Sequence, residues 1–354
     1  MRRIAREVRI GNIAVGGQNP VAVQSMLSRP AHDIQANVEQ AVQLQQAGCA
    51  VLRVSVPKIE NVALITEIKK AIIIPLVADI HFDYRIALAS LEAGIDKIRI
   101  NPGNIGSAEK VKIVADACKA RHVPIRIGVN GGSLEKDLLV QYGGPTAEAL
   151  VESAMKHVQM LEEVEFTDII ISIKSSNVPT MIEAYSLLAQ RCAYPLHLGV
   201  TEAGTFRAGL VKNAMGIGAL LMQGIGDTLR VSLSADPVEE VLAGYDILRA
   251  AGLPARGAEV ISCPTCGRTN IDVAGMAEEV ERRLIHLNKP LKVAVMGCVV
   301  NGIGEGHEAD IGIAGGIDSA VLFVKGERIK TLRGDIVGQL LEEIEARGLI
   351  DTTE

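Results

Sequence analysis

Residues 50–57 read AVLRVSVP, residues 74–81 read IPLVADIH and residues 96–103 read DKIRINPG, and these three runs decide the fold. Each is a short run of apolar and β-branched residues with polar side chains near its end. Each is followed by a loop and a helical pattern. Such runs are typical of strands buried on both faces of a parallel sheet. Because they alternate with helical segments, they indicate an α/β architecture.

The same pattern occurs eight times before residue 237. The other five runs are VAVQSM (21–26), PIRIGVN (124–130), DIIISIKSS (168–176), PLHLGVTE (195–202) and TLRVSLSAD (228–236). Eight such units in this length predict a (β/α)₈ TIM barrel, which takes about 250 residues. The alternative is an open doubly wound sheet, which typically carries a glycine fingerprint after its first strand. The sequence has no such fingerprint there.

Two segments depart from the repeat. The first residues alternate apolar and polar side chains around Gly11-Asn12, which predicts a β-hairpin. The long connection GVNGGSLEKDLLVQYGG (128–144) has two interpretations, a mobile loop over the barrel mouth or an ordinary insertion.

The repeat stops near Leu253–Gly257, so we predict a barrel domain over residues 1–254 and a small α+β domain over 255–354. The second domain is expected to begin with a turn that contains cysteines. The elements predicted after it are a helix over 273–287, strands over 292–298 and 309–315, a hairpin over 320–330 that turns at Lys325-Gly326, and a helix over 335–347.

The composition of the chain limits the classes of partner that the protein can bind. The 354 residues are 48% apolar and 22% charged, with a formal net charge of −6, and this excludes non-specific nucleic-acid binding through a basic surface. No apolar run approaches the roughly 18 residues of a membrane span. The Arg-rich start contains Glu7 and lacks serine, which favours the hairpin over a transit peptide. We therefore predict a cytoplasmic protein without nucleic-acid or membrane partners.

Barrel enzymes place their chemistry at the C-terminal ends of the strands. Five cationic side chains lie inside otherwise apolar strands here, and a buried unpaired cation costs several kcal/mol. One alternative is that each pairs with a local carboxylate such as Asp79, Glu202 or Asp227, but these acids are too few for all five. An anionic ligand fits better, and a diphosphate matches guanidinium groups geometrically. The five cations are Arg53, Arg99, Arg126, Lys174 and Arg230.

Other polar residues accompany them at the strand ends: Gln24, Asp79, His81, Asn101, Asn130, His197, Glu202 and Ser232. Glu202 and Asp79 are candidate proton donors or orienting groups. His81 and His197 are either phosphate ligands or histidines satisfied within the core.

Three of the six cysteines cluster in sequence. Cys263-Pro-Thr-Cys266 has a spacing that lets two thiolates bind one metal, and Cys298 follows within GCVVNGIGE (297–305). One alternative is a zinc site completed by His307. An iron–sulfur cluster usually takes four cysteines, so three would leave one iron for Glu305, seven residues beyond Cys298. The remaining cysteines, Cys49, Cys118 and Cys192, are expected to be small buried hydrophobes.

Together these motifs resemble one family, the bacterial 4-hydroxy-3-methylbut-2-enyl diphosphate synthases of the non-mevalonate isoprenoid route, in their short two-domain form. The likeness runs from Val21 to about Gly316. It is carried by QSM (24–26), AGCAVLRVSVP (47–57), ADIHFDYRIA (78–87), KIRINPGNIG (97–106), RIGVNGGSLE (126–135), LGVTEAG (198–204), ISCPTCGR (261–268) and MGCVVNGIGE (296–305).

The resemblance implies a [4Fe–4S] cluster on Cys263, Cys266, Cys298 and Glu305, a flavodoxin or ferredoxin as electron donor, and a homodimer in which one subunit's cluster domain caps the other's barrel. It implies that 2-C-methyl-D-erythritol 2,4-cyclodiphosphate is held through its diphosphate by Arg53, Arg99, Arg126, Lys174, Arg230 and Ser232. After QSM the family usually continues Thr-Asn-Thr, whereas this chain has Leu27-Ser28-Arg29-Pro30, and Arg29 is a candidate replacement for the lost contacts.

The expected reaction is a reductive dehydroxylation, with Glu202 supplying or relaying a proton. Two alternatives remain at this point: a redox-neutral iron–sulfur dehydratase, and an iron–sulfur carrier or sensor in which the barrel is only a scaffold.

Overall fold

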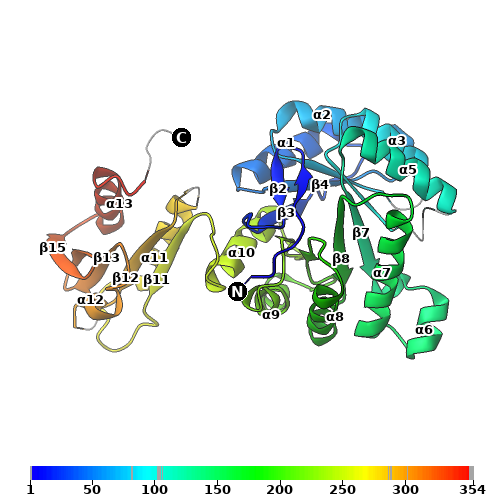
Figure 1. Cartoon of the computed structure of the whole chain (residues 1–354). Helices are drawn as coiled ribbons and strands as arrows, with labels where there is room; N and C mark the ends of the chain where they lie inside the picture. The colour runs from blue at the N-terminus through cyan, green and yellow to red at the C-terminus, as the bar shows by residue number, and fades with distance from the viewer. Residues whose placement is uncertain are drawn as a thin grey trace. The chain divides into compact units, whose positions relative to one another are not determined.

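The chain forms two compact units, Met1–Leu253 and Pro254–Glu354 (Figure 1). The structure, a computed structural model, describes residues 2–80, 83–101, 105, 107–285, 287, 289–300 and 302–350, and the side chains of Ser133 and Glu305 are not described. The separate roles assigned to the two units remain predictions.

The first unit is built on eight parallel strands. They are β3 (Ala22–Met26), β4 (Val51–Ser55), β5 (Leu76–Asp79), β6 (Lys97–Ile100), β7 (Ile125–Asn130), β8 (Ile169–Lys174), β9 (His197–Leu198) and β10 (Thr228–Leu229). Each strand pairs with the next from β3 to β8, and β10 pairs with both β3 and β9. A parallel bridge between Ile171 and Leu196 joins β8 to β9 and closes the ring. The predicted TIM barrel is confirmed.

The last two strands are much shorter than predicted. The runs over 195–202 and 228–236 contribute only two paired residues each, His197–Leu198 and Thr228–Leu229. A Cβ atom at Gly199 would lie 2.9 Å from the Arg230 carbonyl oxygen, so the two chains approach closely just beyond the strands. Glu202 and Ser232 therefore belong to connecting segments rather than to strands.

Helices alternate with these strands and surround the barrel, as Figure 1 shows. They are α1 (Ile34–Gln46), α2 (Ala63–Ala71, after the 3-10 turn Ile59–Val62), α3 (Tyr84–Glu92), α5 (Ala108–Arg121), α7 (Ala147–Glu162), α8 (Val178–Arg191), α9 (Phe206–Met222) and α10 (Pro237–Ala250). Several begin at a side chain that accepts a hydrogen bond from the first turn, such as Asp33, Thr146 and Asp236. These caps lie directly after the strand-end loops, so each helix start also anchors a loop at the barrel mouth.

The predicted N-terminal hairpin is confirmed as β1 (Val8–Ile10) and β2 (Ile13–Val15), joined at Gly11, whose φ is +55°. Its apolar residues pack against the first residues of the barrel strands in a cluster of Val8, Ile10, Val15, Val51, Val77 and Ile170. The hairpin thus covers the end of the barrel opposite the predicted site.

The long connection 128–144 contains the short turn η2 (Gly131–Ser133) and α6 (Lys136–Tyr142), which packs beside α7 (Figure 1). Glu135 at the start of α6 accepts a 2.8 Å hydrogen bond from Ser153 of α7, and its other oxygen lies 3.2 Å from Nε2 of the buried His157. This docking on the outer helical layer favours the insertion over the mobile loop.

The second unit is a five-stranded sheet in the order β11-β12-β13-β14-β15. Its strands are β11 (Ala258–Ser262), β12 (Leu291–Met296), β13 (Ile311–Gly316), β14 (Ser319–Val324) and β15 (Glu327–Leu332), and its helices are α11 (Val273–Leu284), α12 (Gly302–Glu305) and α13 (Ile336–Ala346). Strand β11 was not predicted from the sequence, where only a turn was expected, because most of its residues are half-buried at an edge of the sheet. The first three strands are parallel, and the last two continue antiparallel.

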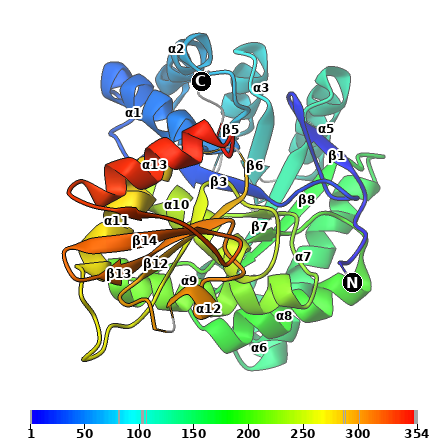
Figure 2. The ribbon, with the colours of Figure 1, turned by 90° about the vertical axis from the view of Figure 1, so that its left-hand side faces the viewer.

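The sheet has a core on each face. α11 and α13 pack on one face, where Val280, Leu284 and Leu340 join the sheet residues, and Figure 2 shows α13 lying along the strands. The other face carries Met296 and Phe323, with Ile303 of α12 packed against them. The small unit therefore has its own core, and its cysteine loops extend from the sheet edge.

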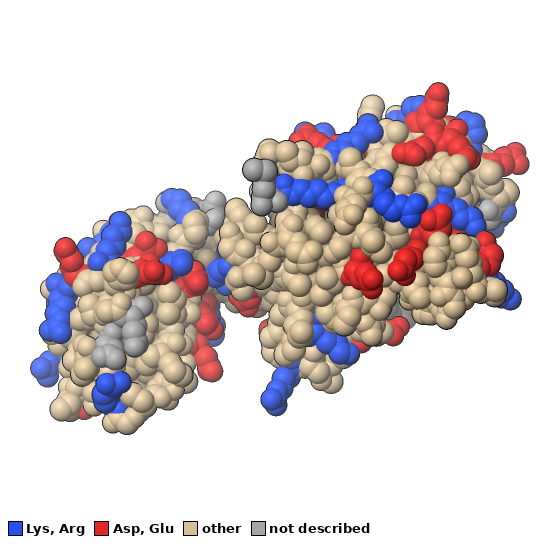
Figure 3. Space-filling view, turned by 60° about the horizontal axis from the view of Figure 1, so that its bottom comes forward, with Lys and Arg blue, Asp and Glu red and all other residues tan. Residues whose placement is uncertain are grey.

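No helix in the described part of the chain combines the length and apolar character that a membrane span requires. On the face drawn in Figure 3, acidic and basic side chains are interspersed over both units.

Candidate active site

The five predicted cations meet in one region of the barrel. Burial and the positive charges of four neighbours, Arg53, Arg230, Arg126 and Arg99, hold the pKa of Lys174 well below its usual value. Only groups that lie near one another interact in this way. The structure therefore brings together residues that are up to 177 positions apart, 230 minus 53.

Asp79, at the end of β5, pairs with two of these cations. One carboxylate oxygen lies 2.5 Å from Nη2 of Arg53 and the other 3.2 Å from Nη1 of Arg99. All three side chains are more than nine-tenths buried. Asp79, predicted as a substrate-binding or orienting residue, thus holds two guanidinium groups in place.

Gly128 makes room for one of these groups. A Cβ atom there would lie 2.7 Å from Nη2 of Arg99, which crosses the neighbouring strand β7 at this position. No larger residue fits without moving the guanidinium.

Arg126 differs from the others. It is fully buried, and its Nε, Nη1 and Nη2 atoms have no hydrogen-bond partner among the described residues. Burial, followed by the charges of Arg53 and Arg99, holds its pKa well below the usual range. A buried guanidinium without an acceptor is strongly unfavourable, so this position requires an anion from outside the described chain.

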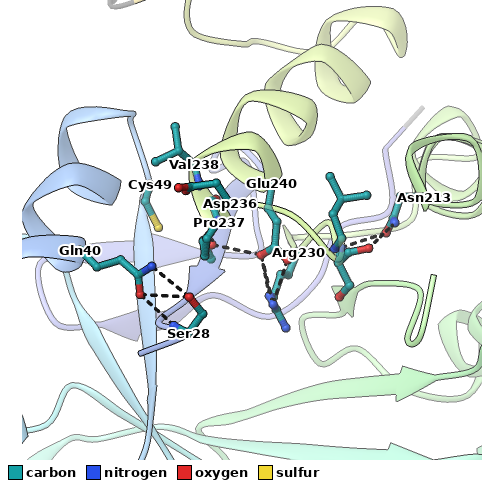
Figure 4. A network of polar contacts seen from close by, with 12 residues as sticks. Ser28, Gln40, Cys49, Asn213, Arg230, Asp236, Pro237, Val238 and Glu240 are labelled. Atoms are coloured by element: carbon teal, nitrogen blue, oxygen red, sulfur yellow. Dashed lines mark hydrogen bonds and ion pairs between the residues drawn. The ribbon is translucent and has the colours of Figure 1, made fainter. Parts of the chain in front are cut away.

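Arg230 lies just beyond β10 and pairs with Glu240 of α10, which is 2% exposed. Its Nε and Nη2 atoms both donate to the carboxylate at 3.1–3.2 Å (Figure 4). Asp79 and Glu240 are the carboxylates paired with the five predicted cations in the described structure, so these five cations keep an excess of three positive charges, five minus two.

His197 is fully buried in β9. Its Nδ1 lies 2.8 Å from the Thr228 hydroxyl, while Nε2 has no partner among the described residues. Burial and the surrounding cations, Arg126 first, hold its pKa well below the usual value, so the ring is neutral. Only one of its two ring nitrogens therefore has a hydrogen-bond partner among the described residues.

The remaining predicted residues differ in placement. Asn101 and Asn130 lie at the ends of β6 and β7, the former buried and the latter half-buried, while His81 lies outside the described residues. Glu202 is exposed in the segment after β9, with a left-handed backbone φ of +51°. Non-glycine residues in this conformation are uncommon and concentrate at functional sites.

Sequence reasoning missed three residues of this region: Lys97, Asn213 and Glu240. Lys97 is fully buried in β6, with Nζ 3.4 Å from the Gln24 side-chain oxygen. Lys97, Arg99 and Asn101 are every second residue along β6 and the position after it, so their side chains point to the same face of the sheet. This spacing was visible in the sequence. Glu240 occurs on the apolar stripe of α10 beside Val241 and Gly244, which also signalled burial.

The second candidate centre lies at one edge of the small sheet. Cys263 directly follows β11 and Cys298 lies two residues after β12, and these strands are parallel and adjacent, with Ser262 opposite Val295. The Gly297 N–H donates to the Cys263 sulfur at 3.2 Å. Two of the three predicted cysteines are therefore brought to the same edge by the topology.

The third cysteine is not gathered with them. Cys266 is exposed on a turn in which Thr265 has a left-handed φ of +46°. Among residues whose side chains are described, no three His, Cys, Asp or Glu lie close enough to hold a metal ion. The Glu305 side chain lies outside the described residues, although its backbone belongs to α12.

The edge nonetheless suits a thiolate-bound group. The chain is closely packed around the residue before Cys298, because a Cβ at Gly297 would lie 2.9 Å from the Thr269 hydroxyl and one at Gly315 would lie 2.5 Å from the Gly297 carbonyl oxygen. Thiolate donors select zinc or iron–sulfur centres. The residues present fit such a group in donor chemistry and in the convergence of two donors.

The zinc alternative with His307 does not fit. A Cβ at Gly326 would lie 3.3 Å from the His307 Cβ, so His307 lies beside the turn between β14 and β15. That turn is at the start of β13, since Ile311 pairs with Val324, and so at the opposite edge of the sheet from the cysteines.

The other cysteines behave as the sequence predicted, in part. Cys49 and Cys118 are buried, and burial raises the pKa of each thiol to about 12, which makes both unreactive. Cys192 is only half-buried.

Comparison with known proteins identifies the family. The family model described as the GcpE TIM-barrel domain matches residues 5–245, and that of the GcpE protein C-terminal domain matches residues 259–346. The chain belongs to the GcpE family. The resemblance stated from the sequence motifs is thereby confirmed.

Relatives that match over nearly the whole chain support this assignment. A protein of Caldanaerobacter subterraneus is 59% identical over 98% of this chain and 98% of its own length, and one of Clostridium perfringens is 56% identical over 97% and 99%. A third, from Nitratidesulfovibrio vulgaris, is 55% identical over 97% of this chain and 90% of its own. All three are named 4-hydroxy-3-methylbut-2-en-1-yl diphosphate synthase (flavodoxin).

Solved structures match the GcpE barrel in fold alone. Dihydropteroate synthase of Stenotrophomonas maltophilia covers 71% of this chain and 100% of its own, with a TM-score of 0.52 and 14% identity. That of Xanthomonas albilineans covers 70% and 99%, with a TM-score of 0.51 and 16% identity.

Proposed function

We propose that this chain catalyses the reductive ring opening and dehydroxylation of 2-C-methyl-D-erythritol 2,4-cyclodiphosphate to 4-hydroxy-3-methylbut-2-enyl diphosphate. The observation that carries the proposal is Arg126, a buried guanidinium with no acceptor among the described residues, at the meeting point of four other cations. The names of the GcpE relatives support a diphosphate as the anion, and the family resemblance implies the cyclodiphosphate as substrate.

The barrel binds the diphosphate. Arg126 and Lys174 lack a carboxylate partner in the described structure, so they supply the charge that the ligand neutralises. Arg53, Arg99 and Arg230 are held by acids and act as oriented donors, with Ser232, Asn101 and Asn130 adding neutral contacts. His81 belongs to the same proposed set, and neutral His197 donates or accepts through Nε2. Such preorganised donors stabilise charge on the diphosphate oxygen as the ring opens.

The small unit holds the redox cofactor. We assign a [4Fe–4S] cluster to Cys263, Cys266 and Cys298, with Glu305 as the non-cysteine ligand. When bound, such a cluster supplies single electrons and a Lewis-acidic iron.

The reaction consumes two electrons and two protons. The ring C–O bond to the diphosphate breaks, one hydroxyl leaves as water and a carbon–carbon double bond forms. Expulsion of hydroxide without a proton is slow, so an acid must serve the leaving oxygen. Glu202 is exposed and projects from the segment after β9, and we assign this proton transfer to it.

The electrons come from a flavodoxin or ferredoxin, and the relatives' names favour flavodoxin. We also propose a homodimer and a cytoplasmic location. Light scattering of the purified protein would measure the oligomeric state directly.

Anaerobic turnover of the cyclodiphosphate with and without reduced flavodoxin tests the function. Product is expected only with the reductant. Product without reductant would establish the redox-neutral dehydratase instead, and no product in either arm would favour the carrier or sensor.

Glu305→Ala tests the ligand set. This variant should retain part of the iron and an altered electron paramagnetic resonance spectrum, with turnover lost. Asp318→Ala, at an exposed turn of the same unit, serves as control. An unchanged spectrum in Glu305→Ala would remove Glu305 from the cluster.

A further inference from the structure

Residues 230–233 form a short segment beyond β10 that the sheet does not hold. β10 ends at Leu229, and in the described part of the chain the one further backbone bond toward the sheet runs from the Arg230 N–H to the Leu198 oxygen at 3.0 Å. Two proposed substrate ligands, Arg230 and Ser232, lie on this segment. Something other than strand pairing must therefore position them.

Two buried side chains from the flanking helices contact the segment, as Figure 4 shows. Asn213 of α9 donates to the Ser232 carbonyl oxygen at 3.1 Å and accepts from the Ser232 N–H at 3.4 Å. Glu240 of α10 accepts from the Leu233 N–H at 3.0 Å. These contacts take the place of a strand ladder.

Glu240 also holds the Arg230 side chain. It accepts from both Nε and Nη2 of Arg230 at 3.1–3.2 Å, and Ser25 of β3 donates to the same carboxylate at 3.2 Å. Helix α10 can place it there because Gly244 lets the helix approach β3, where a Cβ would lie 2.8 Å from Val23. Glu240 is thus bonded to the arginine, to the main chain after it and to the neighbouring strand.

This pairing uses only one edge of the guanidinium. Nε and Nη2 face Glu240, whereas Nη1 donates no hydrogen bond to a described residue, and the Arg230 side chain remains 17% exposed. A bidentate carboxylate fixes the plane of a guanidinium as well as its position. The free Nη1 edge is therefore aimed rather than mobile.

We propose that Glu240 is a positioning residue for substrate binding: it fixes Arg230 so that its Nη1 edge binds a diphosphate oxygen. The inference rests on the proposed function and extends it to a residue that does not touch the substrate. If Glu240 acted only as a counter-charge to Arg230, it would lower the positive potential at the site and weaken anion binding. As a positioning residue, it strengthens anion binding instead.

The direction in which one substitution changes the Kd for diphosphate distinguishes these two roles. Glu240→Gln removes the charge and leaves one acceptor oxygen for the donors from Arg230, Leu233 and Ser25. If Glu240 positions Arg230, the Kd for inorganic diphosphate rises about tenfold, which is about 1.4 kcal/mol. The KM for the cyclodiphosphate rises in step, while kcat falls less than threefold. An unchanged or lower Kd would overturn the proposal.

Asp236→Asn is the matched control. It removes the same charge from the N-cap of the same helix, where the Asp236 side chain accepts from the Val238 N–H, and asparagine caps helices equally well. Its Kd should stay within twofold of wild type. A rise equal to that of Glu240→Gln would show a general charge effect and overturn the proposal.

A double-mutant cycle with Arg230→Met tests whether Glu240 acts through Arg230. The double variant should bind diphosphate as Arg230→Met does, within twofold, whereas additive losses would contradict the proposal.

Glu240→Asp is the second variant, in case Glu240→Gln does not fold. It keeps the negative charge but moves the carboxylate away from Arg230, so the Kd for diphosphate should rise about threefold. An unchanged Kd would contradict the proposal. Because diphosphate binding needs no turnover, wild-type protein that binds diphosphate but forms no product would refute the proposed function alone.

Discussion

The barrel mouth and the cysteine edge are built in opposite ways. At the mouth, three of the five proposed ligand-binding cations are already held by protein partners: Asp79 fixes two arginines and Glu240 a third. At the edge, Cys263 and Cys298 approach through the topology of β11 and β12, while Cys266 stays exposed.

The difference follows from the energetics of the two groups. Buried guanidinium groups are charged in every state, so the fold must pair them or leave them at a cost of several kcal/mol. Thiols can remain neutral and need no partner until a metal binds, and metal binding itself then orders the site. The mouth is therefore preorganised, whereas the order of the edge depends on the proposed cofactor.

The largest expected effect separates the two regions. Cys298→Ser should lose the bound iron and at least about a thousandfold of turnover, because three thiolates are the minimum for the proposed cluster. Its affinity for inorganic diphosphate should stay within threefold of wild type, since the barrel is unaltered. Iron and sulfide analysis with calorimetric titration measures both. Cys192→Ser changes a half-buried barrel cysteine and serves as control, and it should keep both its iron and its affinity for diphosphate. Loss of diphosphate binding in Cys298→Ser would show that the barrel mouth depends on the cysteine edge.

Arg126→Met should weaken diphosphate binding about a hundredfold, since a charge-assisted pair with a buried cation is worth roughly 3 kcal/mol. The same variant should raise the free energy of unfolding of the ligand-free barrel by about 1–4 kcal/mol, because it removes an unpaired buried charge. Urea denaturation with and without diphosphate measures the two effects. A destabilised apo variant would mean that Arg126 has a protein partner.

Asp79→Asn should have the opposite sign from Arg126→Met. It leaves Arg53 and Arg99 without their carboxylate, so the free energy of unfolding should fall by about 3 kcal/mol. Urea denaturation of the ligand-free protein measures this loss, and saturating diphosphate should restore part of it. An apo stability equal to wild type would contradict the view that the mouth is preorganised by its acids.

The smallest effect concerns pH. The pKa of His197 is far below its unfolded value of about 6.5, so the unfolded chain binds a proton that the folded chain does not. Stability must therefore fall as pH drops through 6.5, by about 1 kcal/mol between pH 6.5 and 5.5. His197→Asn, which keeps an acceptor or donor toward Thr228, should lose this part of the slope in thermal unfolding. Parallel curves for the two proteins would mean that His197 is charged in the fold.

The barrel was predictable because its strands are apolar runs with β-branched residues, and the five cations stood out against them. The small sheet was predictable except for β11, whose half-buried residues carry no alternation. The acids that pair with these cations were harder to predict. Asp79 lies at a strand end and was found, whereas Glu240 lies on a helix and contacts a residue ten positions earlier only through the close packing of α10 on β3.

The length of the last two strands could not be predicted, because it depends on the close approach of Gly199 to Arg230 rather than on either run alone. The cysteine spacing predicted a metal centre, and the adjacency of β11 and β12 gives that spacing a structural basis for two of its thiols.

Titration of iron-free protein with inorganic diphosphate tests the contrast between the two regions most directly. One diphosphate site per chain is expected, with a Kd within threefold of that of the cluster-loaded protein. Binding that appears only after the cluster is restored would contradict this expectation.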